Sequence, residues 1–163
     1  MKLQNAAHWA EIVSALAIVI SLLYVGIQVT DNTSATRSAS ASHANTEFIA
    51  WYTHVSSDPQ LMDVWLRGVK EPDSLTEQEF LRFIFLLHIV MLQFQNNYYL
   101  EQEGTLEERI LLTITTTLTT IKGTPGFDRY WALRKNYFFL EYRSFIEELM
   151  YNSEYKPSPT YAQ

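Results

Sequence analysis

Hydrophobic residues follow one another without a charge near the start of the chain, from Ile12 to Ile27. With its flanks the stretch covers about 20 residues, and at about 1.5 Å per residue a helix of that length matches the roughly 30 Å hydrocarbon thickness of a bilayer. The stretch is longer than the roughly 7–15 apolar residues of a cleavable signal peptide. We therefore expect a transmembrane helix over residues 10–29, after a flank of residues 1–9. A signal peptide and a core helix of a soluble protein are the alternatives.

Small and polar residues recur at helical spacing along one face of this segment. Small residues allow membrane helices to approach closely, and Ser or Gln can hydrogen-bond across the contact. We therefore expect this face to pack against a protein partner or a second copy of the chain. The alternative is that lipid simply tolerates Ala and Ser. The residues of this face are Ala10, Ser14, Ala17, Ser21, Tyr24 and Gln28.

The segment that follows is rich in Ala, Ser and Thr, a composition that also occurs in flexible linkers. It contains no helix-breaking Gly or Pro, and several of its residues recur on one helical face. We therefore expect the membrane helix to continue as a helical stalk over residues 30–55. The residues of that face are Ala35, Ala39, Ser42, Thr46 and Ile49.

Helix-start and helix-stop signals divide residues 56–151 into a bundle of about four to five shorter helices. Ser57 or Asp58 precedes Pro59, a residue suited to a first helical turn. Thr76 and Glu79 form a capping box before a helix expected to run to residue 103, where Gly104 would end it.

The remaining helices are predicted in the same way. Thr105 and Glu108 form a second capping box, whose helix stops at Gly123, and Thr124-Pro125 starts another. A last helix is expected from about residue 141 to 151, before a flexible tail of residues 152–163. The overall prediction is an all-α chain.

Residues 110–121 read ILLTITTTLTTI, and β-branched residues of this kind prefer strands. No partner strand is evident elsewhere, and the preceding cap and following glycine favour a helix. We predict a helix here.

The helix expected over residues 76–103 carries two apolar faces. One consists of Phe80, Ile84, Leu87, Met91, Phe94 and Tyr98. The second consists of Leu81, Phe85, Ile89, Leu92 and Tyr99. A helix that is apolar nearly all round is buried on most sides. Either it lies at the centre of the bundle, or the second face contacts lipid or a protein partner.

The amino-acid composition excludes some classes of function. The net charge of −6 argues against a general nucleic-acid binder, and the absence of cysteine excludes disulfides and thiolate chemistry. His43 and Glu47 are spaced for one helix face, but no further ligand joins them, so no metal site is predicted. His88, inside an apolar run, is expected to be a hydrogen-bonded core residue. No catalytic or cofactor-binding motif is present.

Several segments together resemble a widespread family of uncharacterised bacterial proteins, which have an N-terminal transmembrane helix followed by a small all-helical domain. The longest is W-x-E-I-V-x-A-x-A-I-V-I-S-L-L-Y-V-G-I-Q-V-x-x-N-T, residues 9–33. Others are D-P-Q-L at 58–61, W-L-R-G at 65–68 and S-L-T-E-Q-E at 74–79. The resemblance implies a single-pass protein of the bacterial inner membrane and implies no activity, cofactor or catalytic residue.

The chain departs from that family where basic residues usually follow the membrane helix. Thr30 and Asp31 stand there, and only Arg37 remains nearby, against Lys2 and the amino terminus on the other side. Lys and Arg mark the cytoplasmic side of a membrane helix. The side of the helical domain therefore stays open, with the cytoplasm slightly favoured by the resemblance.

Three hypotheses of function follow. The preferred one is a non-catalytic accessory or scaffolding subunit of a bacterial membrane complex. The alternative is a membrane-anchored sensor or binding bundle whose aromatic interior, near Asn96 and Asn97, holds an apolar small molecule. The third is an enzyme with ionisable groups at His43, Glu47 and His54.

Overall fold

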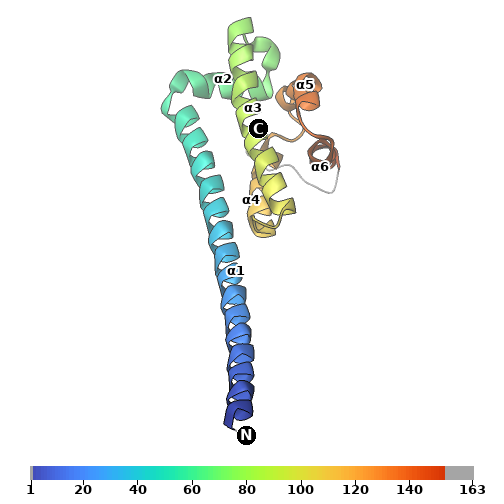
Figure 1. Cartoon of the computed structure of the whole chain (residues 1–163). Coiled ribbons are helices and arrows are strands. Elements are labelled where there is room, and N and C mark those ends of the chain that lie inside the picture. Colours follow the sequence, from blue (N-terminus) through green and yellow to red (C-terminus); the bar gives the residue numbers. More distant parts are fainter. Residues whose placement is uncertain (1, 153–163) are drawn as a thin grey trace. The chain divides into compact units, whose positions relative to one another are not determined.

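The computed structural model describes residues 2–152, with side chains from His8 onward. Within that range every regular element is a helix, which confirms the all-α prediction (Figure 1). The elements are α1 (Lys2–Ser57), α2 (Pro59–Lys70), η1 (Pro72–Ser74), α3 (Glu77–Gln102), α4 (Glu108–Leu118), η2 (Thr119–Ile121), α5 (Pro125–Arg134), η3 (Lys135–Tyr137) and α6 (Leu140–Tyr151). The predicted tail lies, from residue 153 on, outside the described residues.

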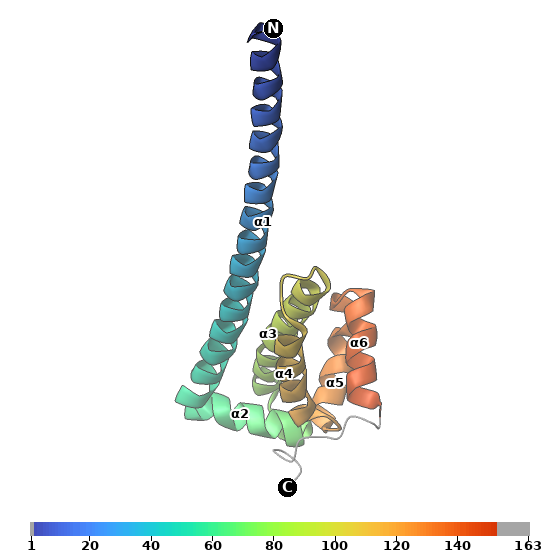
Figure 2. The same ribbon diagram turned by 90° about the horizontal axis from the view of Figure 1, so that it is seen from below.

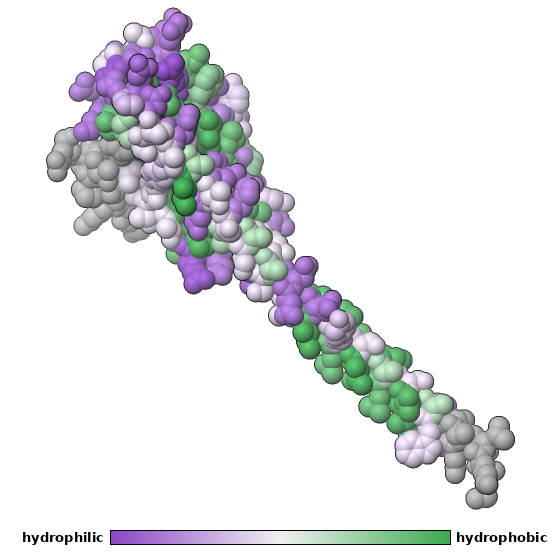
Figure 3. Space-filling model, turned by 90° about the vertical axis from the view of Figure 1, so that its left-hand side faces the viewer, coloured by the Kyte–Doolittle hydropathy of each residue, from purple (hydrophilic) through white to green (hydrophobic). Residues whose placement is uncertain are grey.

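The chain divides into two compact units between Ala39 and Ser40. The first unit is the N-terminal part of α1, whose hydrophobic side chains lie on its surface (Figure 3). Residues 30–55 are helical, as predicted. The bundle, however, begins at Ser40 and not at residue 56, because the last turns of α1 belong to the second unit.

Aromatic contacts explain why the end of α1 belongs to the bundle. The rings of Phe48 and Phe94 lie 5.2 Å apart, and those of Trp51 and Trp65 lie 4.9 Å apart. The indole N–H of Trp51 also donates to the main-chain oxygen of Leu86 at 3.2 Å. These contacts hold α1 against α2 and α3.

The face of α1 that packs in the second unit is not the face on which the small residues of the stalk recur. Ala44 and Val55 are 1% and 2% exposed, whereas Ile49 of the predicted face is 65% exposed. The packed face carries the large side chains of Phe48 and Trp51, which contact α3 and α2, whereas Ser42 and Thr46 are exposed.

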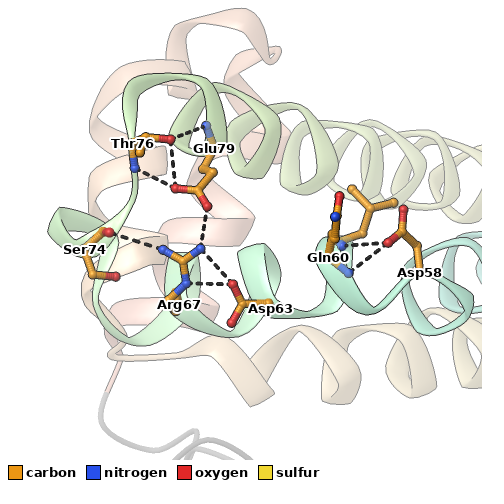
Figure 4. Close-up of polar contacts among 8 residues, drawn as sticks. Asp58, Gln60, Asp63, Arg67, Ser74, Thr76 and Glu79 are labelled. Carbon is orange, nitrogen blue, oxygen red and sulfur yellow. Dashed lines mark hydrogen bonds and ion pairs between the residues drawn. The ribbon is translucent and has the colours of Figure 1, made fainter.

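Side-chain caps begin α2 and α3 (Figure 4). The carboxylate of Asp58 accepts from the N–H groups of Gln60 at 2.8 Å and Leu61 at 3.3 Å. At the start of α3 the Glu79 N–H donates to the Thr76 hydroxyl at 3.3 Å, and the Thr76 N–H donates to the Glu79 carboxylate at 2.8 Å. Both predicted caps are confirmed.

The second predicted capping box is wrong. The Thr105 hydroxyl and N–H donate to the Leu100 oxygen at 3.0 and 2.9 Å, so this residue ends α3 and does not start α4. Gly104, at φ 68°, turns the chain into the left-handed region that brings these donors back to the last carbonyls of α3. Glu107 precedes α4 without a side-chain cap.

Helix α4 confirms the helical prediction for residues 110–121 and excludes the strand. Its threonine hydroxyls donate to main-chain oxygens four residues earlier, as Thr113 does to Arg109 at 2.9 Å and Thr116 does to Leu112 at 2.9 Å. These bonds satisfy the hydroxyls inside the helix. The helix then tightens into η2, which ends at Ile121, and Gly123, at φ 71°, turns the chain away from it.

Within the second unit, α2 lies crosswise to α3, and α5 and α6 lie side by side (Figure 2). The buried Tyr142 hydroxyl of α6 donates to the Met91 oxygen of α3 at 3.0 Å. Helix α5 meets α2 at Gly126, where a Cβ atom would lie 2.1 Å from the Gly68 oxygen. Only glycine permits two backbones to approach this closely.

Candidate functional site

The apolar stretch of α1 is exposed on all sides within the chain. Every large hydrophobic side chain from Ile12 to Val29 is between 50% and 67% exposed, and none of the stretch is buried. The helix is long and apolar enough to cross a membrane, a property that a signal sequence also has. Such a surface has an unfavourable free energy in water, so the stretch needs an apolar environment.

Two polar side chains on the predicted packing face of this stretch, Ser21 and Gln28, form hydrogen bonds within the helix. The Ser21 hydroxyl donates to the Ala17 oxygen at 2.8 Å, and the Gln28 amide donates to the Tyr24 hydroxyl at 2.9 Å. Ser21 and Gln28 therefore have partners without a second helix. The role of the whole face in helix packing stays a prediction; its residues are Ala10, Ser14, Ala17, Ser21, Tyr24 and Gln28.

The second apolar face of α3 is exposed in the second unit. We call it the outer α3 face and define it by Leu81, Phe85, Ile89, Leu92 and Tyr99, which are between 43% and 53% exposed. The opposite side of α3 is buried, including Phe83, Leu87 and Met91 at 0%. Of the two alternatives left open by the sequence, the one in which the bundle itself covers the second face of α3 is therefore excluded, and contact of this face with lipid or a partner stays a prediction.

A groove runs along the outer α3 face. Its lining comes from the end of α1, from α2 and from α3, and consists of His54, Leu61, Gln78, Leu81, Arg82, Phe85, Leu86 and Ile89. Arg82 gives this lining a positive charge, and none of the lining side chains is acidic. An apolar ligand surface with a negative group would therefore complement it.

The titratable residues singled out from the sequence do not gather into one cluster. The His43 ring nitrogen lies 3.7 Å from the Glu47 carboxylate in an exposed pair on α1. His54 lines the groove described above. Among the side chains described, no three His, Asp or Glu residues are placed to hold a metal ion.

His88 lies in an aromatic environment between α3 and the chain around α5. Its Nδ1 atom is 2.8 Å from the Tyr130 hydroxyl, and the Phe138 ring centroid is 5.4 Å from that of the imidazole. Burial, with a smaller contribution from Arg134, lowers the pKa of His88, and burial raises the pKa of Tyr130. Both groups are therefore neutral at pH 7, and His88 is hydrogen-bonded, as predicted, but partly buried and not a fully buried core residue.

The second unit also contains an apolar cavity, which sequence reasoning did not locate. It has a volume of about 110 Å³ and lies among α1, α2, α3, α4 and η2. Its lining consists of Phe48, Trp51, Tyr52, Val55, Ser56, Met62, Trp65, Leu87, Val90, Phe94, Thr117, Leu118, Thr120 and Ile121. We call it the interhelical cavity. Asn96 and Asn97, for which the sequence left open a pocket lining or a packed core, are not in its lining, and Asn97 is buried.

Comparisons with known proteins found no family model that matches the sequence, and no curated protein or solved structure that matches it.

Proposed function

We propose that this chain is a non-catalytic, single-pass protein of the bacterial inner membrane that serves as an accessory or scaffolding subunit of a membrane complex. The observation that carries the proposal is the apolar stretch of α1, which is exposed throughout its length. Apolar side chains at the centre of a membrane helix each favour insertion by about 0.3–0.6 kcal/mol, so a stretch of this length favours the bilayer by several kcal/mol. No cofactor or metal is part of the proposal.

The outer α3 face supports a role as a subunit. Half-exposed Phe, Tyr, Leu and Ile side chains along one helix resemble the centre of a protein interface more than an ordinary surface. The neighbouring groove places Arg82 beside Phe85. The partner that fits this surface is a protein presenting an apolar helix face with an acidic residue opposite Arg82.

Membrane insertion is tested by fractionating cells that express the full chain and washing the membranes at alkaline pH. We expect the intact chain, including its N-terminus, to stay with the membranes. In the double variant Ile20→Arg and Leu23→Arg each charge adds about 2.5–3.5 kcal/mol to the cost of insertion, so the variant should move to the aqueous fraction. Intact wild type in the aqueous fraction, or a product shortened by signal cleavage, contradicts the proposal.

The subunit role is tested with a photo-crosslinking amino acid at position 85, on the outer α3 face. Ser144, exposed on α6, is the control position. We expect one protein to be crosslinked in membranes from position 85 and not from position 144. We also expect Phe85→Asp to abolish co-purification of that protein without changing the unfolding temperature. Crosslinks to lipid alone, or none, argue against the partner.

A further inference from the structure

The interhelical cavity has a buried floor and a partly exposed rim. Its floor consists of Val55, Trp65, Leu87, Val90, Phe94, Leu118 and Ile121, each 7% exposed or less. At the rim Tyr52 is 50% exposed and Ser56 is also exposed. A molecule can therefore enter at the rim and become surrounded by side chains of the floor.

The lining carries no group that would hold an ion. None of the residues that line the cavity is Lys, Arg, His, Asp or Glu. A charged molecule would lose its hydration there without an opposite charge to replace it, which is strongly unfavourable. The ligand of this site is therefore uncharged.

Three polar hydrogens of the lining, on Thr120, Thr117 and Trp51, already have acceptors. The Thr120 hydroxyl donates to the Thr117 oxygen at 2.7 Å, and the Thr117 hydroxyl donates to the Thr113 oxygen at 3.2 Å. The Trp51 indole N–H donates to the Leu86 oxygen. These groups do not need a polar ligand, so a ligand that enters can be apolar.

The volume of the cavity and the side chains of its walls restrict the range of possible ligands further. The volume of about 110 Å³ is close to that of apolar cavities, of about 150 Å³, that are known to bind benzene. Phe48, Trp51, Trp65 and Phe94 supply aromatic walls that can pack against a flat ring in edge or offset geometry. We propose that the interhelical cavity is a binding site for an uncharged molecule with a single aromatic ring.

The site lies wholly in the second unit, so this inference holds whether or not α1 enters a membrane. The test uses the full chain in lipid nanodiscs and follows fluorobenzene by fluorine NMR, with empty nanodiscs subtracted. We expect saturable binding to the wild type. Fluorobenzoate, an anion of similar ring size, should show at least tenfold weaker binding.

Two variants reduce the cavity volume from different sides. Val90→Phe adds volume at the floor, and Thr120→Leu adds it at a partly exposed position, where folding is less at risk. Each should weaken fluorobenzene binding at least tenfold. Val19→Phe, the same change on the exposed part of α1, is the matched control and should leave binding unchanged.

A further variant tests the chemistry of the lining. Thr117→Val removes a hydroxyl group that donates its hydrogen bond within α4 and not to a ligand. This variant should therefore change the affinity for fluorobenzene by less than threefold. The proposal is overturned if fluorobenzene does not bind the wild type saturably. It is also overturned if both cavity-filling variants bind fluorobenzene as tightly as the wild type does, or if fluorobenzoate binds the wild type as tightly as fluorobenzene does. The far-UV circular dichroism spectrum of each variant shows whether it is folded.

Discussion

Gly126 lies where the backbones of α5 and α2 come together. A Cβ atom there would lie 2.1 Å from the Gly68 oxygen and 2.8 Å from the Val69 Cα atom, and neither backbone atom can rotate away. We expect Gly126→Ala to lower the free energy of unfolding of the second unit by about 1–3 kcal/mol, the usual cost of overpacking, or more. Urea unfolding followed by tryptophan fluorescence measures the change.

The matched control for this prediction is Gly26→Ala. No atom outside the helix backbone lies within 4 Å of the place where a Cβ would be added at Gly26, which belongs to the first unit. The second unit of this variant should unfold as the wild type does. Equal effects of the two substitutions would show that close backbone packing is not the cause.

Glu79 makes the stability of the second unit depend on acid pH. The Arg67 guanidinium, which donates to its carboxylate at 2.6 Å, and then the Thr76 backbone lower the pKa of Glu79 from 4.5 to about 2 (Figure 4). Since the folded-state pKa is the lower one, the stabilisation is present above about pH 4.5 and is lost as the pH falls towards 2.

The Glu79→Gln variant should therefore lose less unfolding free energy than the wild type between pH 5 and 3. Thermal unfolding at several pH values measures the slope. Glu148→Gln, which removes the same charge at an exposed position of α6, should keep the wild-type slope. Parallel curves for wild type and Glu79→Gln would exclude the Arg67 pair as the source of the acid dependence.

At the scale of single elements, Lys122 caps the C-terminal end of α6. Its ammonium group donates to the Leu149 oxygen at 3.0 Å and to the Asn152 oxygen at 2.5 Å, which are among the last carbonyls at that end. A cation at a helix C-terminus stabilises it through hydrogen bonds and through the helix dipole. This long-range cap is not visible as a sequence motif.

We expect Lys122→Met to lower the free energy of unfolding by about 1 kcal/mol and to expose the last turn of α6 to amide hydrogen exchange. Lys122→Arg, which keeps a charged donor, should restore part of the protection. Unchanged exchange in Lys122→Met would mean that other bonds hold this turn.

The elements that could be predicted from sequence are those with local signals. The caps at Asp58 and Thr76 involve residues within a few positions of each other, so their residue pattern identifies them. Thr105 has the same local pattern but serves the preceding helix, because Gly104 turns the chain back on α3. A capping motif alone therefore does not tell which of two adjacent helices it stabilises.

Tertiary features could be predicted only in part. The two apolar faces of α3 follow from periodicity, but whether the outer α3 face is covered depends on where the other helices pack. The contact of His88 with Tyr130 joins residues far apart in the chain, and no sequence signal pairs them. The interhelical cavity arises from side chains of several helices together, so no single segment indicates it.

At the scale of the whole molecule, the boundary between the two units decides which fragment can fold. A chain that begins at Ser40 keeps the part of α1 that carries Phe48, Trp51 and Val55. A chain that begins at residue 56, the boundary expected from sequence, lacks these side chains. Losing a large core residue costs about 3–5 kcal/mol, against a total stability of about 5–15 kcal/mol for a domain.

We therefore expect the fragment that begins at Ser40 to unfold in one cooperative thermal transition, and the fragment that begins at residue 56 to show none. Circular dichroism and tryptophan fluorescence measured together identify such a transition. A cooperative transition in the shorter fragment would show that the end of α1 is dispensable for the bundle.

The interhelical cavity also makes the folded state of the second unit sensitive to pressure. An apolar void of about 110 Å³ disappears when the chain unfolds, so the unfolded state occupies less volume, by an amount on the order of tens of mL/mol. Hydrostatic pressure should consequently shift the equilibrium towards the unfolded chain at constant temperature. Val90→Phe, which occupies the void, should raise the pressure at which half of the molecules are unfolded.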